Sequence, residues 1–303
     1  MRHAGEDAVQ RRLGVHERMA EVMGQVVRTW MPEQHRELFC KLPTLLVGSL
    51  DAQGQPWASI LHGTPGFISA PDERHLRIAA RPLPDDPWQP ALGTPLGLLG
   101  LLGLEPQTRR RNRMNGSVVA LDGGGFTVEV DQSFGNCPKY IQARTPQPIE
   151  RGMPPPAQAA GPHLGDAALE LVRHADTLFI ASASRTPRAH AGAEGVDVSH
   201  RGGPPGFVHV DTQDAKTVLT IPDYVGNRFF NTLGNLAVNP RAGLLFIDYH
   251  AGHLLQLTGD AELLWEGELR AIRITVQRAW WRAHALPLRW SPPEPAPQFT
   301  GEA

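Results

Sequence analysis

A glycine, an asparagine and an arginine stand together in the second half of the chain, where a strand-like stretch gives way to a helix-like one. An alternating apolar run over residues 217–222 precedes Gly226-Asn227-Arg228, and residues 229–238 carry apolar side chains at helical spacing. A strand that turns into a helix in this way presents free backbone N–H groups, and arginine adds a permanent, bidentate cation. This combination predicts a phosphate-binding site. The alternative is an ordinary turn that carries a solvated arginine.

The elements that would position this turn occur twice along the chain. Residues 176–182 (DTLFIAS) parallel residues 43–49 (PTLLVGS), and Pro205-Gly206-Phe207 parallels Pro65-Gly66-Phe67. These matches recur at offsets of about 133 to 145 residues, and such self-similarity indicates a tandem duplication. Where the second copy has Gly226-Asn227-Arg228, the first has Asp85-Asp86-Pro87-Trp88, which offers acidic groups in place of a phosphate partner. We therefore expect one intact nucleotide site and one degenerate copy that serves as a wall.

A composite motif points to a known family. The pattern P-D-x-x-G-N-R…N-T-L-G-N-L…N-P-R-A-G-L-L-F, preceded by S-H-R-G-G-P-P-G-F at 199–207, resembles the pyridoxamine 5′-phosphate oxidase-like, flavin-nucleotide-binding split-barrel family. The resemblance extends from about residue 36 to 290. It is to the wider family and not to the biosynthetic oxidase, since the long N-terminal helices and the duplicated barrel argue against pyridoxamine phosphate as substrate.

The resemblance implies a mainly β fold of two tandem split β-barrel repeats with flanking helices, and FMN as cofactor. It places the FMN phosphate on Gly226-Asn227-Arg228, next to the strand residue Ile221, with Ser199 and Arg201 along the ribityl and pyrimidine side. Thr232 and Asn235 either contribute from the helix or are ordinary polar helix positions. The closing Arg289-Trp290 matches the arginine and tryptophan with which family members end near the cofactor.

The first repeat offers a wall for the flavin ring. Its segment Q-S-F-G-N-C-P-K-Y-I resembles the His-Cys-x-Lys segment beside the flavin in many members, and its candidate cofactor residues are Gln132, Ser133, Asn136, Cys137 and Lys139. Asn136 stands where many members have histidine, which removes a proton-transfer group but keeps a hydrogen-bonding side chain. Cys137 is either a redox thiol or a buried, inert cysteine.

The most basic run of the chain is T-R-R-R-N-R at 108–113. In a strand, Arg109, Arg111 and Arg113 share one face, because successive side chains alternate. That face would bind an anionic substrate, a nicotinamide dinucleotide phosphate or the flavin of the pseudo-twofold partner. Alternatively it is an exposed face of a hairpin, or the docking face for a redox partner.

Composition narrows the remaining classes. The net charge of −2 and the absence of long charged runs argue against nucleic-acid binding. The two cysteines form no disulfide framework, and no apolar run reaches transmembrane length, so we expect a cytoplasmic protein outside the membrane. No metal-binding or hydrolase motif occurs.

These observations predict five segments and one function. The segments are a helical flank (1–40) that packs on the barrel or on a partner subunit, the first repeat (41–143), a Pro/Ala-rich linker (144–165), the second repeat (166–290) and a disordered tail (291–303). The expected function is an FMN-dependent oxidoreductase, with NAD(P)H as a candidate electron donor and a small molecule as substrate. The alternative is a non-catalytic flavin- or haem-binding module or electron carrier. The flavin would lie between the barrels of a homodimer or within one fused chain.

Overall fold

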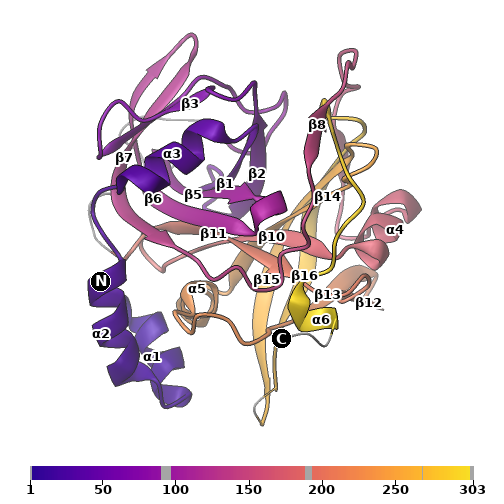
Figure 1. The fold of residues 1–303 in the computed structure, drawn as a ribbon. Helices are drawn as coiled ribbons and strands as arrows, with labels where there is room; N and C mark the ends of the chain where they lie inside the picture. Colours follow the sequence, from indigo (N-terminus) through magenta and orange to yellow (C-terminus); the bar gives the residue numbers. More distant parts are fainter. Residues whose placement is uncertain (1, 90–96, 188–192, 268, 301–303) are drawn as a thin grey trace.

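The computed structural model describes residues 2–89, 97–187, 193–267 and 269–300. Two antiparallel sheets dominate it (Figure 1), which confirms the mainly β fold. The strands of the first sheet are β1 (Thr44–Leu50), β2 (Pro56–His62), β3 (Ile68–Ser69), β4 (His75–Ile78), β5 (Leu98–Glu105), β6 (Arg110–Asp122) and β7 (Gly125–Gly135). Those of the second are β10 (Thr177–Ala183), β11 (Val196–Gly202), β12 (His209–Gln213), β13 (Lys216–Pro222), β14 (Arg241–Ile247), β15 (Leu254–Glu266) and β16 (Leu269–Arg282).

The two sheets have the same strand order. The first runs β2-β1-β5-β6-β7-β4-β3 and the second β11-β10-β14-β15-β16-β13-β12. Registers match as well, since Gly48 lies opposite Gly100 in the first sheet and Ala181 opposite Gly243 in the second. The expected pair of tandem split-barrel repeats is therefore confirmed. The segment limits given above remain a proposal.

The repeats meet along a seam where glycines let backbone touch backbone. A Cβ on Gly100 would lie 2.7 Å from the Cα of Asp197, and a Cβ on Gly243 would lie 2.6 Å from the Cα of Trp57. Asp197 and Trp57 hold equivalent places in β11 and β2, so the two contacts are related by the duplication. Around them, apolar side chains from both repeats form one buried cluster that includes Leu46, Leu102, Phe179 and Leu245. Because no side chain fits between these backbones, glycine is required there.

The N-terminal segment, which the sequence predicted to be helical, forms three helices. They are α1 (Ala4–Arg12), α2 (His16–Val26) and α3 (Glu33–Lys41). The interruption between α1 and α2 falls at Gly14, whose φ of 65° ends the first helix. In Figure 1, α1 and α2 lie beside α5 (Asn231–Val238) of the second repeat. The contact is close, since a Cβ on Gly5 would lie 1.9 Å from the carbonyl oxygen of Gly234.

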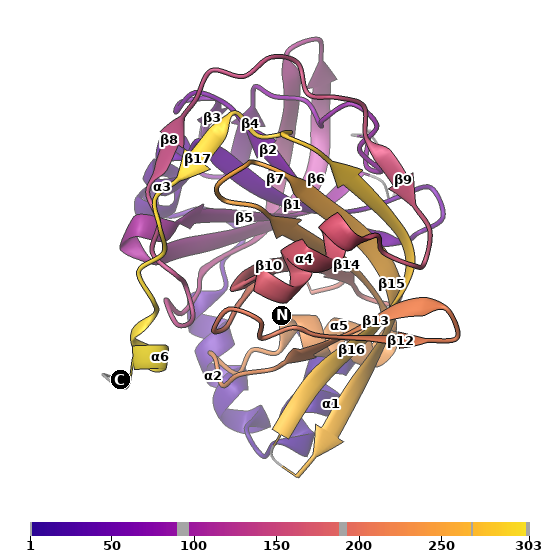
Figure 2. The ribbon, with the colours of Figure 1, turned by 90° about the vertical axis from the view of Figure 1, so that its right-hand side faces the viewer.

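The linker and the C-terminal segment run together over the outside of the barrels (Figure 2). The linker provides β8 (Pro146–Pro148), which pairs with β17 (Leu288–Trp290), and β9 (Gln158–Ala160), which pairs with β16, and α4 (Asp166–His174) follows it. Composition suggested disorder from residue 291. Instead Ala143 and Glu294 form a bridge, Ala296 is buried, and α6 (Pro297–Thr300) ends the described chain. Residues 301–303 lie outside the described residues. Among the residues that the structure describes, no helix is long and apolar enough to cross a membrane.

The glycine seam makes a first prediction. Gly243→Ala should destabilise the protein by about 1–3 kcal/mol, because the new Cβ overpacks a backbone contact. Gly24→Ala is the matched control, since nothing lies within 4 Å of a Cβ at this helical position. The control should be neutral or stabilising by up to about 1 kcal/mol. Urea unfolding of both variants measures the difference, and equal stabilities would contradict the seam.

A second prediction concerns Glu6 of α1, which is 2% exposed. Burial, reinforced by Asp197, raises the pKa of Glu6 from 4.5 to about 8. Between those values the folded chain holds a proton that the unfolded chain has lost, so this contribution to stability falls as pH rises. The free energy of unfolding of wild type minus that of Glu6→Gln should therefore decrease from about pH 5 to about pH 8. If urea unfolding gave the same difference in free energy at every pH, the Glu6 carboxyl would be exposed to solvent and the prediction would be wrong.

Candidate functional site

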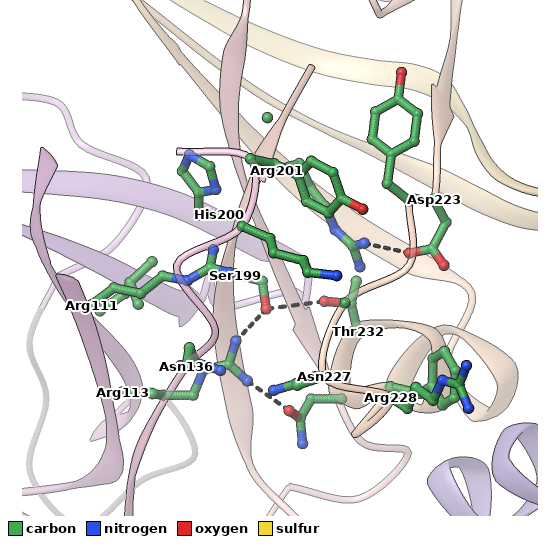
Figure 3. Close-up of a pocket in the computed structure, with 18 of the residues that line it drawn as sticks. Arg111, Arg113, Asn136, Ser199, His200, Arg201, Asp223, Asn227, Arg228 and Thr232 are labelled. Atoms are coloured by element: carbon green, nitrogen blue, oxygen red, sulfur yellow. Dashed lines mark hydrogen bonds and ion pairs between the residues drawn. The ribbon is translucent and has the colours of Figure 1, made fainter. Parts of the chain in front are cut away.

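A pocket lies on the seam and is lined by both repeats. It encloses about 800 Å³, including space open to solvent. The first repeat contributes Arg111 and Arg113 from β6 and the residues around Lys139 that follow β7, and the second contributes β11 and the segment from Pro222 to Thr232. Figure 3 shows Arg111, Arg113 and Asn136 on one side and Ser199, Arg201 and Thr232 on the other. The duplication thus builds within one chain a site that two subunits could otherwise share.

Arg113 is the most firmly held cation of the pocket. Its side chain is 4% exposed, and its Nη1 donates to Asp197 Oδ1 and to Asn231 Oδ1, both at 3.0 Å. The other terminal nitrogen donates to the Ser199 hydroxyl, and the guanidinium lies over the ring of Phe134 at 5.2 Å. Its buried Nε has no partner in the described structure. Arg113 is therefore rigidly oriented with one donor still free.

Arg201 is held from the opposite side. Its Nη1 pairs with Asp223 Oδ1, and the second oxygen of Asp223 accepts from Arg270 Nε at 2.9 Å. The buried Nε of Arg201 likewise has no partner among the described residues. Asp223 is thus shared between two arginines, which leaves Arg201 only partly neutralised.

Arg111 has no carboxylate partner within the described parts of the chain. Its Nε donates to the carbonyl oxygen of Cys137 at 2.9 Å. Burial first, and then the neighbouring Arg113, lower the pKa of Arg111 to about 10. The pKa of His200 in the same pocket is lowered well below its ordinary value by burial and by Arg111 and Arg201. Positive charge is therefore in excess here, and an anion would relieve it.

The hydroxyl groups and the start of α5 complete the site. Thr232 donates to Ser199 Oγ at 3.1 Å, and Asn227 Oδ1 accepts from the Phe229 backbone N–H at 3.1 Å. Arg228 and Phe230 have φ of 62° and 59°, an uncommon conformation for side chains of this size. Such strain gathers at functional sites. Arg228 itself is exposed, makes no hydrogen bond or ion pair with the described residues, and lies apart from the other arginines in Figure 3.

Aromatic side chains border the pocket on the side of the C-terminal segment. Tyr140 and Tyr224, which line the pocket, have ring centroids 5.3 Å apart, and Phe299 of α6 packs on both, at 5.6 Å and 5.9 Å. Tyr140 also has a positive φ of 66°, and its hydroxyl donates to the carbonyl oxygen of Val225 at 2.9 Å. These rings offer the flat apolar surface that an aromatic cofactor needs.

Most of the residues expected at the cofactor do line this pocket: Ser199, Arg201, Gly226, Asn227, Arg228, Thr232, Asn136 and Lys139. The basic strand joins them through Arg111 and Arg113. Arg109 does not, because it precedes β6 in a left-handed conformation and pairs with Glu294 at 2.8 Å. The interpretation of this run as one exposed face of a hairpin is wrong for Arg111 and Arg113, since both line the pocket, and a docking role stays a prediction.

The remaining candidates lie elsewhere. Ile221 is in the core of the second repeat, and Asn235 donates to Ser182 Oγ behind the pocket. Gln132 and Ser133 are buried in β7, where Ser133 forms a hydrogen bond with His35. Of Cys137, only the backbone oxygen takes part, as the acceptor for Arg111 Nε. Arg289 is exposed on β17, and Trp290 packs edge-on against Tyr249 at 5.2 Å, away from the pocket lining.

Five lining residues that matter to the site were not singled out from the sequence: Asp223, Asn231, His200, Tyr140 and Tyr224. Asp223 stands inside the motif P-D-x-x-G-N-R, so the motif contained a signal for it. Asn231 is likewise the first residue of N-T-L-G-N-L, and His200 stands in S-H-R-G-G, whereas no spacing distinguishes the two tyrosines. Among the described residues, no group of three or more His, Cys, Asp or Glu side chains could hold a metal ion.

The equivalent position in the other half of the fold is filled from within. Leu102 lies opposite Arg113, whereas Leu245, which takes the place of Leu102, lies opposite Gln256. Gln256 donates to Asp86 Oδ2 at 3.1 Å, and Ser59, the counterpart of Ser199, donates to Asp86 Oδ1 at 2.8 Å. Asp86 is 5% exposed, and burial raises its pKa. A side-chain carboxyl thus occupies the place where the intact site has open space.

Comparison with known proteins adds the family. Residues 164–298 match the model of the pyridoxamine 5′-phosphate oxidase family, so the match covers the second repeat and not the whole resemblance seen in the sequence. No curated protein matches the chain.

Two similar solved structures are a haem storage protein, HutZ, from Vibrio cholerae and a protein related to general stress protein 26, of the pyridoxinephosphate oxidase family, from Clostridium acetobutylicum. The first is 13% identical with a TM-score of 0.24, and covers 38% of this chain and 89% of its own. The second is 14% identical with a TM-score of 0.26, and covers 41% of this chain and 91% of its own. The similarity to the pyridoxamine 5′-phosphate oxidase family therefore extends over residues 164–298, which include the second repeat.

Proposed function

We propose that the seam pocket binds FMN. The observation that carries this proposal is the excess of guanidinium charge at buried and partly buried positions: Arg111 lacks a carboxylate partner in the described structure, and Arg113 and Arg201 each keep an unpartnered Nε. A phosphate monoester brings close to two negative charges and several acceptor oxygens, which this donor set can use. The match of residues 164–298 to the pyridoxamine 5′-phosphate oxidase family supports a flavin over other phosphates.

In this proposal the phosphate is held by Arg113 and Arg201, with the hydroxyls of Ser199 and Thr232 and with Arg228 at the rim. Asn136, Lys139, Tyr140 and Tyr224 border the remaining space and are the candidates for contacts with the flavin ring. In this assignment Arg113 and Arg201, and not the exposed Arg228, contribute most of the phosphate affinity. The reason is that an anion interacts more strongly with a charge that is shielded from water than with a solvated one.

We further propose that the protein is an oxidoreductase. Bound FMN supplies the chemistry, accepting and returning a hydride or electrons at its N5 atom. The chain's part is to orient the ring and to restrict water, for which the Tyr140 and Tyr224 wall is suited. The cationic pocket also favours an anionic reductant such as NAD(P)H. The two cysteines of the protein, Cys40 and Cys137, form no disulfide, and free cysteines of this kind support a cytoplasmic location.

One observation favours a second candidate, a haem-binding module. His200 lines the pocket with an unpartnered Nδ1, and its lowered pKa keeps the ring neutral and able to bind a metal. Haem also carries anionic carboxylates. Purified protein separates the two candidates by colour, because a haem Soret band and a flavin spectrum differ.

The third prediction tests the arginine cluster. Arg111→Met should weaken FMN binding by about 10-fold or more while raising stability without ligand, since it removes a partly buried charge with no acidic partner. Arg201→Ala should weaken binding by a similar or larger factor, about 10- to 100-fold, and Arg228→Ala by less. Flavin fluorescence titration and thermal unfolding measure both quantities.

Arg110→Met is the matched control. Arg110 adjoins Arg111 in β6, but its Nη2 donates to the backbone oxygen of Gln34, outside the pocket. This variant should bind FMN like wild type. An Arg111 variant that is less stable and binds FMN unchanged would remove the basis for an anion site here.

The fourth prediction concerns stoichiometry and turnover. The protein should take up one FMN per chain, with absorbance bands near ~370 and ~450 nm, because the twin site already contains Asp86. Anaerobic NADPH or NADH should bleach the ~450 nm band if the protein is an enzyme with that donor. Two flavins per chain would contradict the filled twin. A flavin that neither nucleotide reduces would favour a carrier.

A further inference from the structure

The N-terminal helix α1 brings a carboxyl group against the back of the pocket. The backbones of α1 and α5 touch: a Cβ on Gly234 would lie 2.7 Å from the backbone nitrogen of Glu6. Glu6 is consequently buried, although it comes from a segment far from either barrel in sequence.

Local helix structure explains the hydrogen bond of only one of the two carboxyl oxygens of Glu6. Glu6 Oε2 accepts from the His3 backbone N–H at 3.1 Å, while His3 Nδ1 accepts from the Gly5 N–H, which makes a capping box. A capping box needs one carboxyl oxygen. The other, Oε1, accepts from Asn231 Nδ2 at 2.6 Å, across the interface with α5.

Asn231 links Glu6 to the pocket. Its Oδ1 accepts from Arg113 Nη1 at 3.0 Å, and the same nitrogen donates to Asp197 Oδ1. An amide has donors at one end and an acceptor at the other, so an acceptor beside Nδ2 fixes which end faces Arg113. A flipped Asn231 would set two donors against each other. Glu6 therefore stabilises, from the side of α1, the one Asn231 orientation that can hold Arg113.

We propose that Glu6 is a positioning residue of the anion pocket: it fixes the Asn231 amide, which aligns the Arg113 guanidinium for an anionic ligand. The ligand class rests on the proposed function. The alignment itself follows from the contacts among Glu6, Asn231 and Arg113.

The charges around Glu6 are consistent with this role. His3 lies before it on the same element, Asp197 and Arg113 face it from β11 and β6, and Asn231 from α5. Burial and Asp197 raise the pKa of Glu6 to about 8, so the carboxyl is largely protonated at neutral pH. A protonated carboxyl can still present its carbonyl oxygen to Asn231. Glutamine keeps one acceptor oxygen for Asn231, but its NH2 group cannot accept from the His3 N–H. Glu6→Gln therefore preserves the contact with Asn231 and gives up the capping-box contact.

A double-mutant cycle tests the proposal with FMN as the probe. Glu6→Ala and Asn231→Ala should each weaken binding about 10-fold, and the double variant should be no weaker than Asn231→Ala alone, because both act through one contact. Glu6→Gln should bind within about twofold of wild type, since it keeps the acceptor. Glu17→Ala, an exposed glutamate of α2, is the matched control and should change nothing.

The outcomes separate this inference from the proposed function. Glu6→Ala with unchanged affinity, or a double variant that loses the product of both factors, overturns the role of Glu6. Failure of wild type to bind FMN overturns the proposed function, and the same cycle is then run with inorganic pyrophosphate. If the wild type binds neither probe, both proposals fail. Loss of binding in Glu6→Gln with an intact far-UV spectrum would also count against the mechanism, because the acceptor is preserved.

Discussion

The confinement of like charges is the constraint on which the site depends. Three guanidinium groups converge on the pocket between the two barrels: Arg113 is buried, and Arg111 and Arg201 are partly buried. Taking such charges out of water is costly unless carboxylates or hydrogen bonds compensate. Asp197 and Asp223 compensate two of them, and Asp223 is shared with Arg270. The chain accepts an electrostatic cost that only an external anion can remove, which is the usual sign of selection for binding over stability.

The two halves of the fold solve the same geometric problem in opposite ways. Equivalent strands place Ser199 and Arg113 in one half and Ser59 and Gln256 in the other. In the second case Asp86 fills the space with its own carboxyl, whose pKa is raised by burial. A duplicated backbone can thus keep one binding site while the other becomes ordinary core.

The sequence allowed more of the fold to be predicted than of the site. The matching strand segments, the shared Pro-Gly-Phe turns and the Gly226-Asn227-Arg228 junction are local patterns, and the structure has them where they were expected. Arg109 was misplaced because a 3-10 turn at Pro106–Thr108 delays the strand by one residue. The position of Trp290, the ordered C-terminal segment and the docking of α1 depend on contacts between distant segments. No spacing within one segment encodes such contacts, and the role of Asn231 was missed for the same reason.

The covalent link between the barrels also changes how occupancy responds to protein concentration. A cofactor site assembled from two separate subunits dissolves when dilution separates them, and its apparent affinity then depends on how much protein is present. Here Arg113 and Arg201 come from one polypeptide, so the effective concentration of one half around the other is fixed by the linker. In such a chain, occupancy of the site does not fall when the protein concentration is low. Mutations in either half of the site are also inherited together, because one gene encodes both.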